Sequence, residues 1–103
     1  MGQPAAAHGH LILILMSKAI TLYTTRFCPY CIRARSLLDE KKVAYTDIAV
    51  DEQPHLRQEM MERSGQRTVP QIWIGEQHVG GFDDLWRLER QGSLDELLER
   101  ASA

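Results

Sequence analysis

Apolar and polar residues alternate along residues 19–24, which is the two-residue period of a strand with one buried face. The period changes after the first cysteine. Cys31, Ala34 and Leu38 recur at helical spacing, and this pattern continues to about Lys41. The pattern predicts a strand that passes through a short turn into a helix, with both cysteines of the chain at the junction.

The same order of strand and helix follows once more. Residues 44–50 predict a second strand, and residues 51–64 predict a second helix. Pro54 lies near the start of this helix, where a missing N–H costs little, and Gly65 stands where a left-handed residue commonly ends a helix. The first half of the chain therefore forms a βαβα unit.

The second half consists of shorter segments. Residues 71–74 and 77–79 predict two strands joined by a tight hairpin turn. Residues 82–90 predict a helix, and Ser93 with Glu96 has the spacing of a capping box that opens a last helix. The predicted order of elements is β-α-β-α-β-β-α-α.

This order predicts an α/β fold with one mixed sheet. Two strands that are joined through a helix run parallel, because the crossover returns the chain in the same direction. The hairpin adds an antiparallel pair. We expect a four-stranded mixed sheet flanked by helices on both faces.

Composition limits what such a domain can do. With 103 residues and 11.8 kDa the chain is too short for a second core. Its net charge is −2 and its pI is near 6.0, which argues against a dedicated binder of nucleic acid or of an anionic membrane. We expect neither kind of partner, and we expect a monomer.

The first part of the chain is set apart from the fold. Residues 1–15 read as an expression leader or an extended N-terminus and are expected to be disordered, because Met16 looks like a second natural start. No Lys or Arg precedes the short apolar run at residues 11–16, which argues against a secretory signal. Residues 16–103 are therefore expected to form one cytoplasmic domain.

The two cysteines are candidates for chemistry. Cys28 and Cys31 enclose two residues in a C-x-x-C pattern, directly after a strand and at the start of a helix. Unpaired N–H groups and the positive end of the helix dipole favour a thiolate there, and Arg26 adds positive potential. We assign Cys28 as the attacking nucleophile and Cys31, one turn further into the helix, as the resolving thiol.

A zinc site is the alternative reading of the same pair. It needs two further ligands, and beyond the leader only His55 and His78 are available. Neither histidine lies at a spacing typical of zinc ligands. We therefore expect no metal.

Three motifs together resemble a known family. They are C-P-Y-C at residues 28–31, T-V-P at residues 68–70 and G-G-F-D-D at residues 80–84. In order and spacing they are similar to the dithiol glutaredoxins of the C-P-Y-C type, and the resemblance extends over residues 17–98. It implies a thioredoxin-like fold, glutathione as cosubstrate, and reduction of protein disulfides and of protein–glutathione mixed disulfides.

The resemblance also implies partners. Glutathione reductase with NADPH would stand upstream, and ribonucleotide reductase is a plausible client. Two rival functions are kept open: a thioredoxin-like reductant served by a flavoprotein reductase, and an iron–sulfur cluster carrier in which two chains share a cluster through Cys28 and glutathione. Pro29 disfavours the cluster carrier, because related cluster binders usually lack proline at this position.

Carried over residue by residue, the resemblance implies a glutathione site. Tyr30 would flank the glutathione cysteine, and the backbone of Thr68 and Val69 would bind it, beside a cis bond before Pro70. The helix start that follows Gly81 would hold a carboxylate through its N–H groups. The implied set of binding residues is Arg26, Tyr30, Arg67, Thr68, Val69, Pro70, Gly81, Phe82 and Asp83.

Two positions depart from the pattern of the family. Thr25 stands where many members have a lysine, so the group that meets the glycine carboxylate of glutathione stays open among Arg26, Arg67 and Gln66. Phe82 stands where relatives often have a third cysteine. We therefore expect no additional regulatory thiol.

Overall fold

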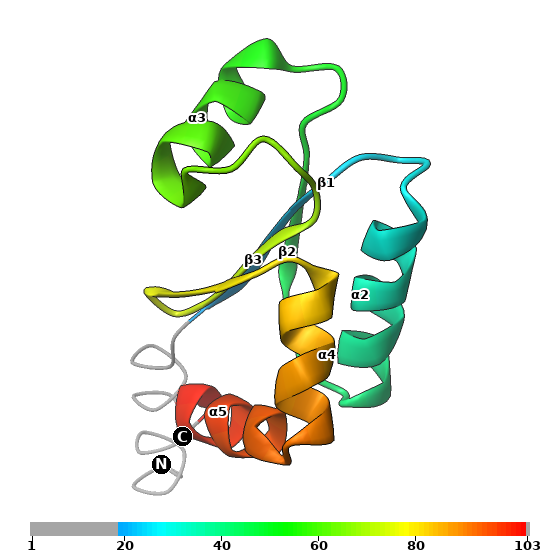
Figure 1. Ribbon diagram of the computed structural model, residues 1–103, viewed down its shortest axis with the longest axis vertical. Helices are drawn as coiled ribbons and strands as arrows, with labels where there is room; N and C mark the ends of the chain where they lie inside the picture. The colour runs from blue at the N-terminus through cyan, green and yellow to red at the C-terminus, as the bar shows by residue number, and fades with distance from the viewer. Residues whose placement is uncertain (1–18, 103) are drawn as a thin grey trace, which may run out of the picture.

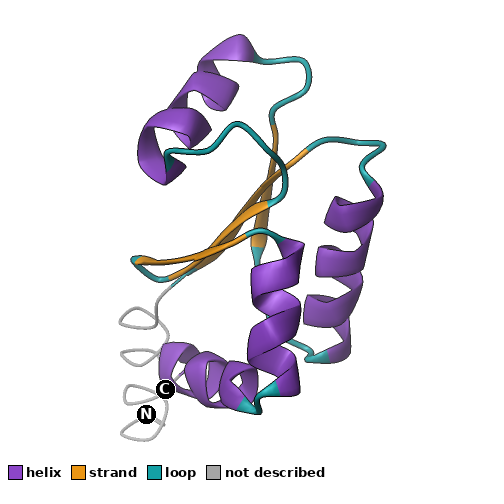
Figure 2. Ribbon diagram, in the orientation of Figure 1, coloured by secondary structure: helices purple, strands orange, loops and turns teal. Residues whose placement is uncertain are grey.

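The computed structural model describes residues 19–102, and the predicted leader at residues 1–15 lies outside them. Figures 1 and 2 show a central sheet with helices on both of its faces. None of the helices within residues 19–102 is long and apolar enough to cross a membrane. The elements are β1 (Ile20–Thr24), α2 (Pro29–Glu40), β2 (Thr46–Ala49), α3 (Pro54–Ser64), β3 (Gln71–Ile74), β4 (Gln77–Gly80), α4 (Phe82–Arg90) and α5 (Ser93–Ser102).

The sheet has four strands in the order β2-β1-β3-β4. β1 pairs with β2 in parallel, whereas the β1–β3 and β3–β4 pairs are antiparallel. This confirms the predicted element order and the predicted mixed sheet. The two central strands β1 and β3 are the most deeply buried, as expected for strands with neighbours on both sides.

Each face of the sheet has its own core. On one face, Leu22 and Ile72 pack against α2, α4 and α5. On the other face, Tyr23 and Trp73 pack against α3, chiefly through Met60. Consecutive residues of a strand point to opposite faces, so β1 and β3 supply side chains to both cores.

The boundaries of α3 differ from the prediction at one end. The helix begins at Pro54 and not at residue 51, because a residue before proline is disfavoured in the helical region, and Gln53 is extended with φ −136° and ψ 91°. At the other end the prediction is confirmed. Gly65 caps the helix in the left-handed conformation with φ 71°.

Candidate active site

Cys28 forms the N-cap of α2. Its backbone is extended, with φ −92° and ψ 117°, and its Sγ accepts a hydrogen bond from the Cys31 N–H at 3.4 Å. Pro29 takes the first helical position, where the missing N–H would have no partner in any case. The sulfur thus takes the place of the capping oxygen that most helices use, and it faces the positive end of the helix.

The two thiols differ in their surroundings. Cys28 is partly exposed, whereas Cys31 is 0% exposed. Burial raises the pKa of the Cys31 thiol to about 12, because a thiolate at that depth would lose its hydration. At neutral pH Cys31 therefore keeps its proton, and Cys28 is the sulfur that a substrate in solution can reach.

A groove of about 470 Å³ runs beside the cysteine loop. The segment before β3 forms one wall, and the Val69–Pro70 bond within it is cis, as expected. The Val69 carbonyl oxygen lies 3.8 Å from Cys28 Sγ, which places the reactive sulfur at the edge of the groove. Seven of the nine expected binding residues line it: Tyr30, Thr68, Val69, Pro70, Gly81, Phe82 and Asp83.

The turn between β4 and α4 forms the opposite wall of the groove. Gly80 has φ 117°, and a Cβ at this position would collide with the Asp84 carboxylate. That carboxylate accepts the Gly81 N–H at 3.0 Å. It thereby satisfies the backbone at the N-cap and leaves the first N–H groups of α4, at Phe82 and Asp83, without partners inside the helix.

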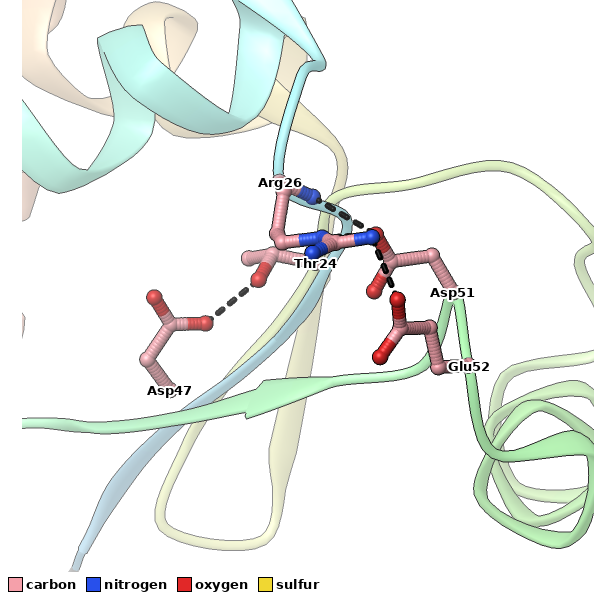
Figure 3. Close-up of polar contacts among 5 residues, drawn as sticks. All are labelled: Thr24, Arg26, Asp47, Asp51 and Glu52. Carbon is pink, nitrogen blue, oxygen red and sulfur yellow. Dashed lines mark hydrogen bonds and ion pairs between the residues drawn. The ribbon is translucent and has the colours of Figure 1, made fainter.

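Arg26 does not line the groove, and its side chain points toward Asp51 and Glu52 (Figure 3). Its Nε donates to Asp51 Oδ2 at 3.1 Å, and its Nη2 lies 2.5 Å from Glu52 Oε2. The backbone N–H of Arg26 donates to the same Asp51 oxygen at 3.2 Å. We call Arg26, Asp51 and Glu52 the acidic clamp, because two carboxylates neutralise the one guanidinium.

The contacts within the acidic clamp also shift the pKa values of Asp51 and Arg26. The Arg26 N–H, followed by the Arg26 side chain, lowers the pKa of the Asp51 carboxyl, and the hydrogen bond from Arg26 to Asp51 raises the pKa of the guanidinium. Both groups therefore stay charged and paired at neutral pH. The positive potential that the sequence attributes to Arg26 at the cysteine loop is offset by these two acids.

Of the other two candidates for binding a carboxylate, Gln66 lines the groove and Arg67 does not. Arg67 is exposed in the segment that precedes Val69, and its carbonyl accepts a hydrogen bond from Arg57 Nη1 at 3.4 Å.

Within the described residues no group of three or more His, Cys, Asp or Glu side chains is arranged to hold a metal ion.

Comparison with known proteins agrees with this geometry. The Glutaredoxin family model matches residues 20–79. A glutaredoxin from Pseudomonas aeruginosa is 58% identical over 79 residues, which cover 77% of this chain and 94% of that protein. The chain belongs to the glutaredoxin family.

Solved glutaredoxin structures share the fold. The solution structure of a glutaredoxin from Brucella melitensis has 47% identity and a TM-score of 0.72, and it covers 84% of this chain and 94% of that one. The crystal structure of a buckwheat glutaredoxin–glutathione complex has 26% identity and a TM-score of 0.77, with 94% of this chain and 89% of that one covered. The thioredoxin-like fold and a thiol–disulfide oxidoreductase activity follow for this glutaredoxin.

Two residues that line the groove were not expected there from the sequence, which considered His78 only as a zinc ligand. Gln71, the first residue of β3, is 2% exposed, and His78 lies on the neighbouring strand β4. The signal that could have found Gln71 is its position, because it lies two residues from Trp73 and therefore on the same face of a buried strand. A buried polar side chain at such a position needs hydrogen-bond partners.

Proposed function

We propose that this glutaredoxin uses glutathione to reduce protein–glutathione mixed disulfides and protein disulfides. The observation that carries the proposal is the position of the partly exposed Cys28 sulfur, 3.8 Å from the Val69 carbonyl at the edge of the groove. The backbone there can pair with an extended peptide as one more strand would. The buckwheat relative that was solved as a glutathione complex supports the same ligand.

The walls of the groove match the chemistry of glutathione. The backbone of Thr68 and Val69 would bind its cysteine, and Tyr30, which is 51% exposed, would flank it. The free N–H groups at Phe82 and Asp83 would hold the γ-glutamyl carboxylate, and the Asp83 carboxylate would meet the neighbouring ammonium.

For the glycine carboxylate we assign Arg67, with Gln66 as a neutral donor. Arg26 is occupied by Asp51 and Glu52, so its use as a ligand would require two ion pairs to break. Arg67 is exposed, and it neighbours the two residues whose backbone would bind the glutathione cysteine. With this choice, Arg67 would take the role that a lysine at the position of Thr25 has in many members of the family.

The reaction with a mixed disulfide has two exchanges. The Cys28 thiolate attacks the glutathione sulfur, the bond between glutathione and the client protein breaks, and the client leaves as a thiolate that takes up a proton. A second glutathione thiolate then attacks the glutathione sulfur on Cys28. Oxidised glutathione leaves, and the Cys28 thiolate is regenerated.

A disulfide within a client protein needs the second cysteine. Cys28 attacks one client sulfur, the other client sulfur leaves as a thiolate, and a mixed disulfide remains. The Cys31 sulfur loses its proton as it attacks Cys28, forms the Cys28–Cys31 disulfide and releases the second client thiol. Two glutathione molecules then reduce this disulfide and leave as oxidised glutathione, which glutathione reductase recycles with electrons from NADPH.

We place this activity in the cytoplasm, in a protein that acts as a monomer. The cytosolic glutathione pool is reducing enough to regenerate a dithiol of this kind. Ribonucleotide reductase is the client class we propose.

The deciding experiment compares two serine variants. Cys28→Ser is expected to lose all activity, because it removes the nucleophile. Cys31→Ser is expected to keep deglutathionylation, which needs one cysteine, and to lose reduction of intramolecular disulfides. A fully active Cys28→Ser protein would contradict the assignment.

A second assay separates glutathione from its rivals. The purified protein and a disulfide substrate are mixed with NADPH and either glutathione plus glutathione reductase or thioredoxin reductase. The oxidation of NADPH is followed by the loss of its absorbance. Turnover is expected only with glutathione. Turnover only with thioredoxin reductase would favour the thioredoxin-like reductant, and a coloured anaerobic preparation would favour the cluster carrier.

A further inference from the structure

Both polar atoms of the Gln71 side-chain amide have hydrogen-bond partners inside the protein. Its Nε2 donates to the Thr68 carbonyl at 3.0 Å and to Thr68 Oγ1 at 3.2 Å, and its Oε1 lies 2.7 Å from His78 Nε2. The side chain is 2% exposed. Gln71 therefore lies buried in the wall of the groove, where both of its side-chain N–H groups are directed at Thr68 and its oxygen at His78.

The orientation of this amide follows from its partners. A carbonyl can only accept, so the NH₂ group of Gln71 must face Thr68 and its oxygen must face His78. His78 consequently carries a proton on Nε2 and donates to Gln71. A reversed amide would place its oxygen against the Thr68 carbonyl, which is a repulsive contact between two acceptors whatever the tautomer of His78.

His78 is itself held by the core beneath the sheet. Its ring stacks on Trp73 with 4.6 Å between centroids and 26° between planes, and the Arg63 guanidinium lies 4.3 Å from the Trp73 ring centroid. Trp73 is buried and pairs with His78 across β3 and β4. The stack on buried Trp73 thus holds the imidazole from one side.

Thr68 is exposed, lines the groove and directly precedes Val69 in the chain. Its hydroxyl oxygen accepts from Gln71, so the proton of the hydroxyl must point elsewhere. Its carbonyl is also fixed by Gln71. Thr68 therefore presents a hydroxyl donor and a backbone in one defined position.

We propose that Gln71 is a positioning residue for the glutathione site, and that His78 locks its amide in the orientation that holds Thr68. The inference rests on the proposed function. It adds that the Thr68 hydroxyl donates to an oxygen of the peptide-like ligand. It also adds that the loop at Thr68 is already ordered in the free protein, so that ligand binding does not have to supply the entropy cost of ordering it. A binding loop that is ordered in advance binds more tightly.

The test uses two variants and a matched control. Gln71→Glu removes both donors and places a carboxylate against the Thr68 carbonyl. His78→Phe keeps an aromatic ring on Trp73 but removes the Nε2 donor. Gln77→Glu makes the same chemical change as the first variant at an exposed position of β4, outside the groove.

The expected result is a change in binding without a change in chemistry. The KM for a glutathionylated peptide should rise about tenfold in Gln71→Glu and about threefold in His78→Phe, with kcat within about twofold of the original. Alkylation of Cys28 by iodoacetamide should keep its rate in all three proteins, and Gln77→Glu should match the original throughout. A KM for Gln71→Glu equal to that of the control would overturn the inference, as would a parallel loss of kcat and alkylation rate.

Two further measurements keep the test decisive. If Gln71→Glu does not fold, the KM of His78→Phe decides together with the exchange rate of the Gln71 side-chain NH₂ protons in that variant, because His78 itself lines the groove. If the original protein shows no turnover with glutathione, the proposed function fails, and NMR then judges the positioning separately. The Gln71 side-chain NH₂ protons should exchange slowly and respond to His78→Phe, whereas fast exchange typical of a free amide would refute the lock.

Discussion

The cysteine loop is flanked by two polar regions that differ in how many hydrogen-bonding groups they leave available to a ligand. On the groove side, polar side chains organise the backbone: Gln71 holds Thr68, and Asp84 holds the Gly81 N–H. On the other side, the acidic clamp joins Arg26 to Asp51 and Glu52, and its charges satisfy one another.

The difference shows how a binding surface is made in a small domain. At the groove, Gln71 and Asp84 form hydrogen bonds with the backbone of the walls. The Phe82 and Asp83 N–H groups and the Thr68 hydroxyl proton then stay available to a ligand. Charged side chains that pair with each other at the surface leave nothing for a ligand, however close they lie to the nucleophile in the sequence. Four predictions test this contrast.

The largest effect is expected at the turn that supports the groove. Gly80→Ala forces a side chain into a backbone with φ 117° and against the Asp84 carboxylate, whereas Gly65→Ala meets nothing within 4 Å. Urea unfolding should show a loss of about 2–3 kcal/mol for Gly80→Ala and about 1 kcal/mol for Gly65→Ala, where only the left-handed backbone is disfavoured. Equal losses would show that the carboxylate does not constrain the turn.

The second prediction concerns the buried thiol between the two regions. The pKa of Cys31 is raised from 9.0 to about 12, so the folded protein holds this proton more tightly than the unfolded chain. The resulting stability is complete below the unfolded pKa and is lost as the pH rises through this range. Under reducing conditions, the unfolding free energy should fall by up to about 1.4 kcal/mol per pH unit more in the original protein than in Cys31→Ser.

Comparison with Cys31→Ser is needed because other groups also titrate at high pH. Burial raises the pKa of Tyr23 and Tyr45 as well, and both are present in the two proteins. Their contributions therefore cancel in the difference. Parallel pH profiles would indicate that Cys31 has an ordinary pKa.

The third prediction compares the two arginines. Arg67→Ala should raise the KM for a glutathionylated peptide about threefold to tenfold, because it removes a charged partner of a carboxylate. Arg26→Ala should leave that KM nearly unchanged, because its guanidinium is occupied by the acidic clamp. The reverse ranking would show that the acidic clamp opens when the ligand binds.

The smallest effect is expected within the acidic clamp itself. The pKa of Asp51 is lowered, chiefly by the Arg26 N–H, so its contribution to stability is present above the ordinary value of 3.8 and is lost as the pH falls through the lowered value. In NMR titration of the carboxyl carbon, Arg26→Ala should return this pKa only part of the way, because the backbone N–H remains. A complete return would assign the shift to the guanidinium.

Much of the fold is local and could be predicted. The change of period from two to 3.6 residues locates β1 and α2, and the left-handed glycine at Gly65 ends α3. The start of α3 was predicted three residues too early, because the acidic segment before Pro54 is helix-compatible in composition while the proline restricts Gln53. Boundaries of this kind depend on one residue, whereas the existence of an element depends on many.

The candidate site was predictable where it depends on neighbours in the chain. Cys28 precedes a proline and lies three residues before Cys31, so its place at the N-cap follows from helix geometry. Gln71 and His78 were missed because their contact is made by the register of β3 against β4 and by the stack on Trp73. No spacing along the sequence reports such a register.

The sequence by itself thus determined the order of the elements, the family and the place of Cys28 at the N-cap of α2. Each of these depends on short-range periodicity and on motifs. The tertiary structure alone decided that Arg26 meets Asp51 and Glu52 and that Gln71 supports Thr68. The physical reason is that charge pairing and desolvation act through space, between groups that chain folding brings together from distant positions.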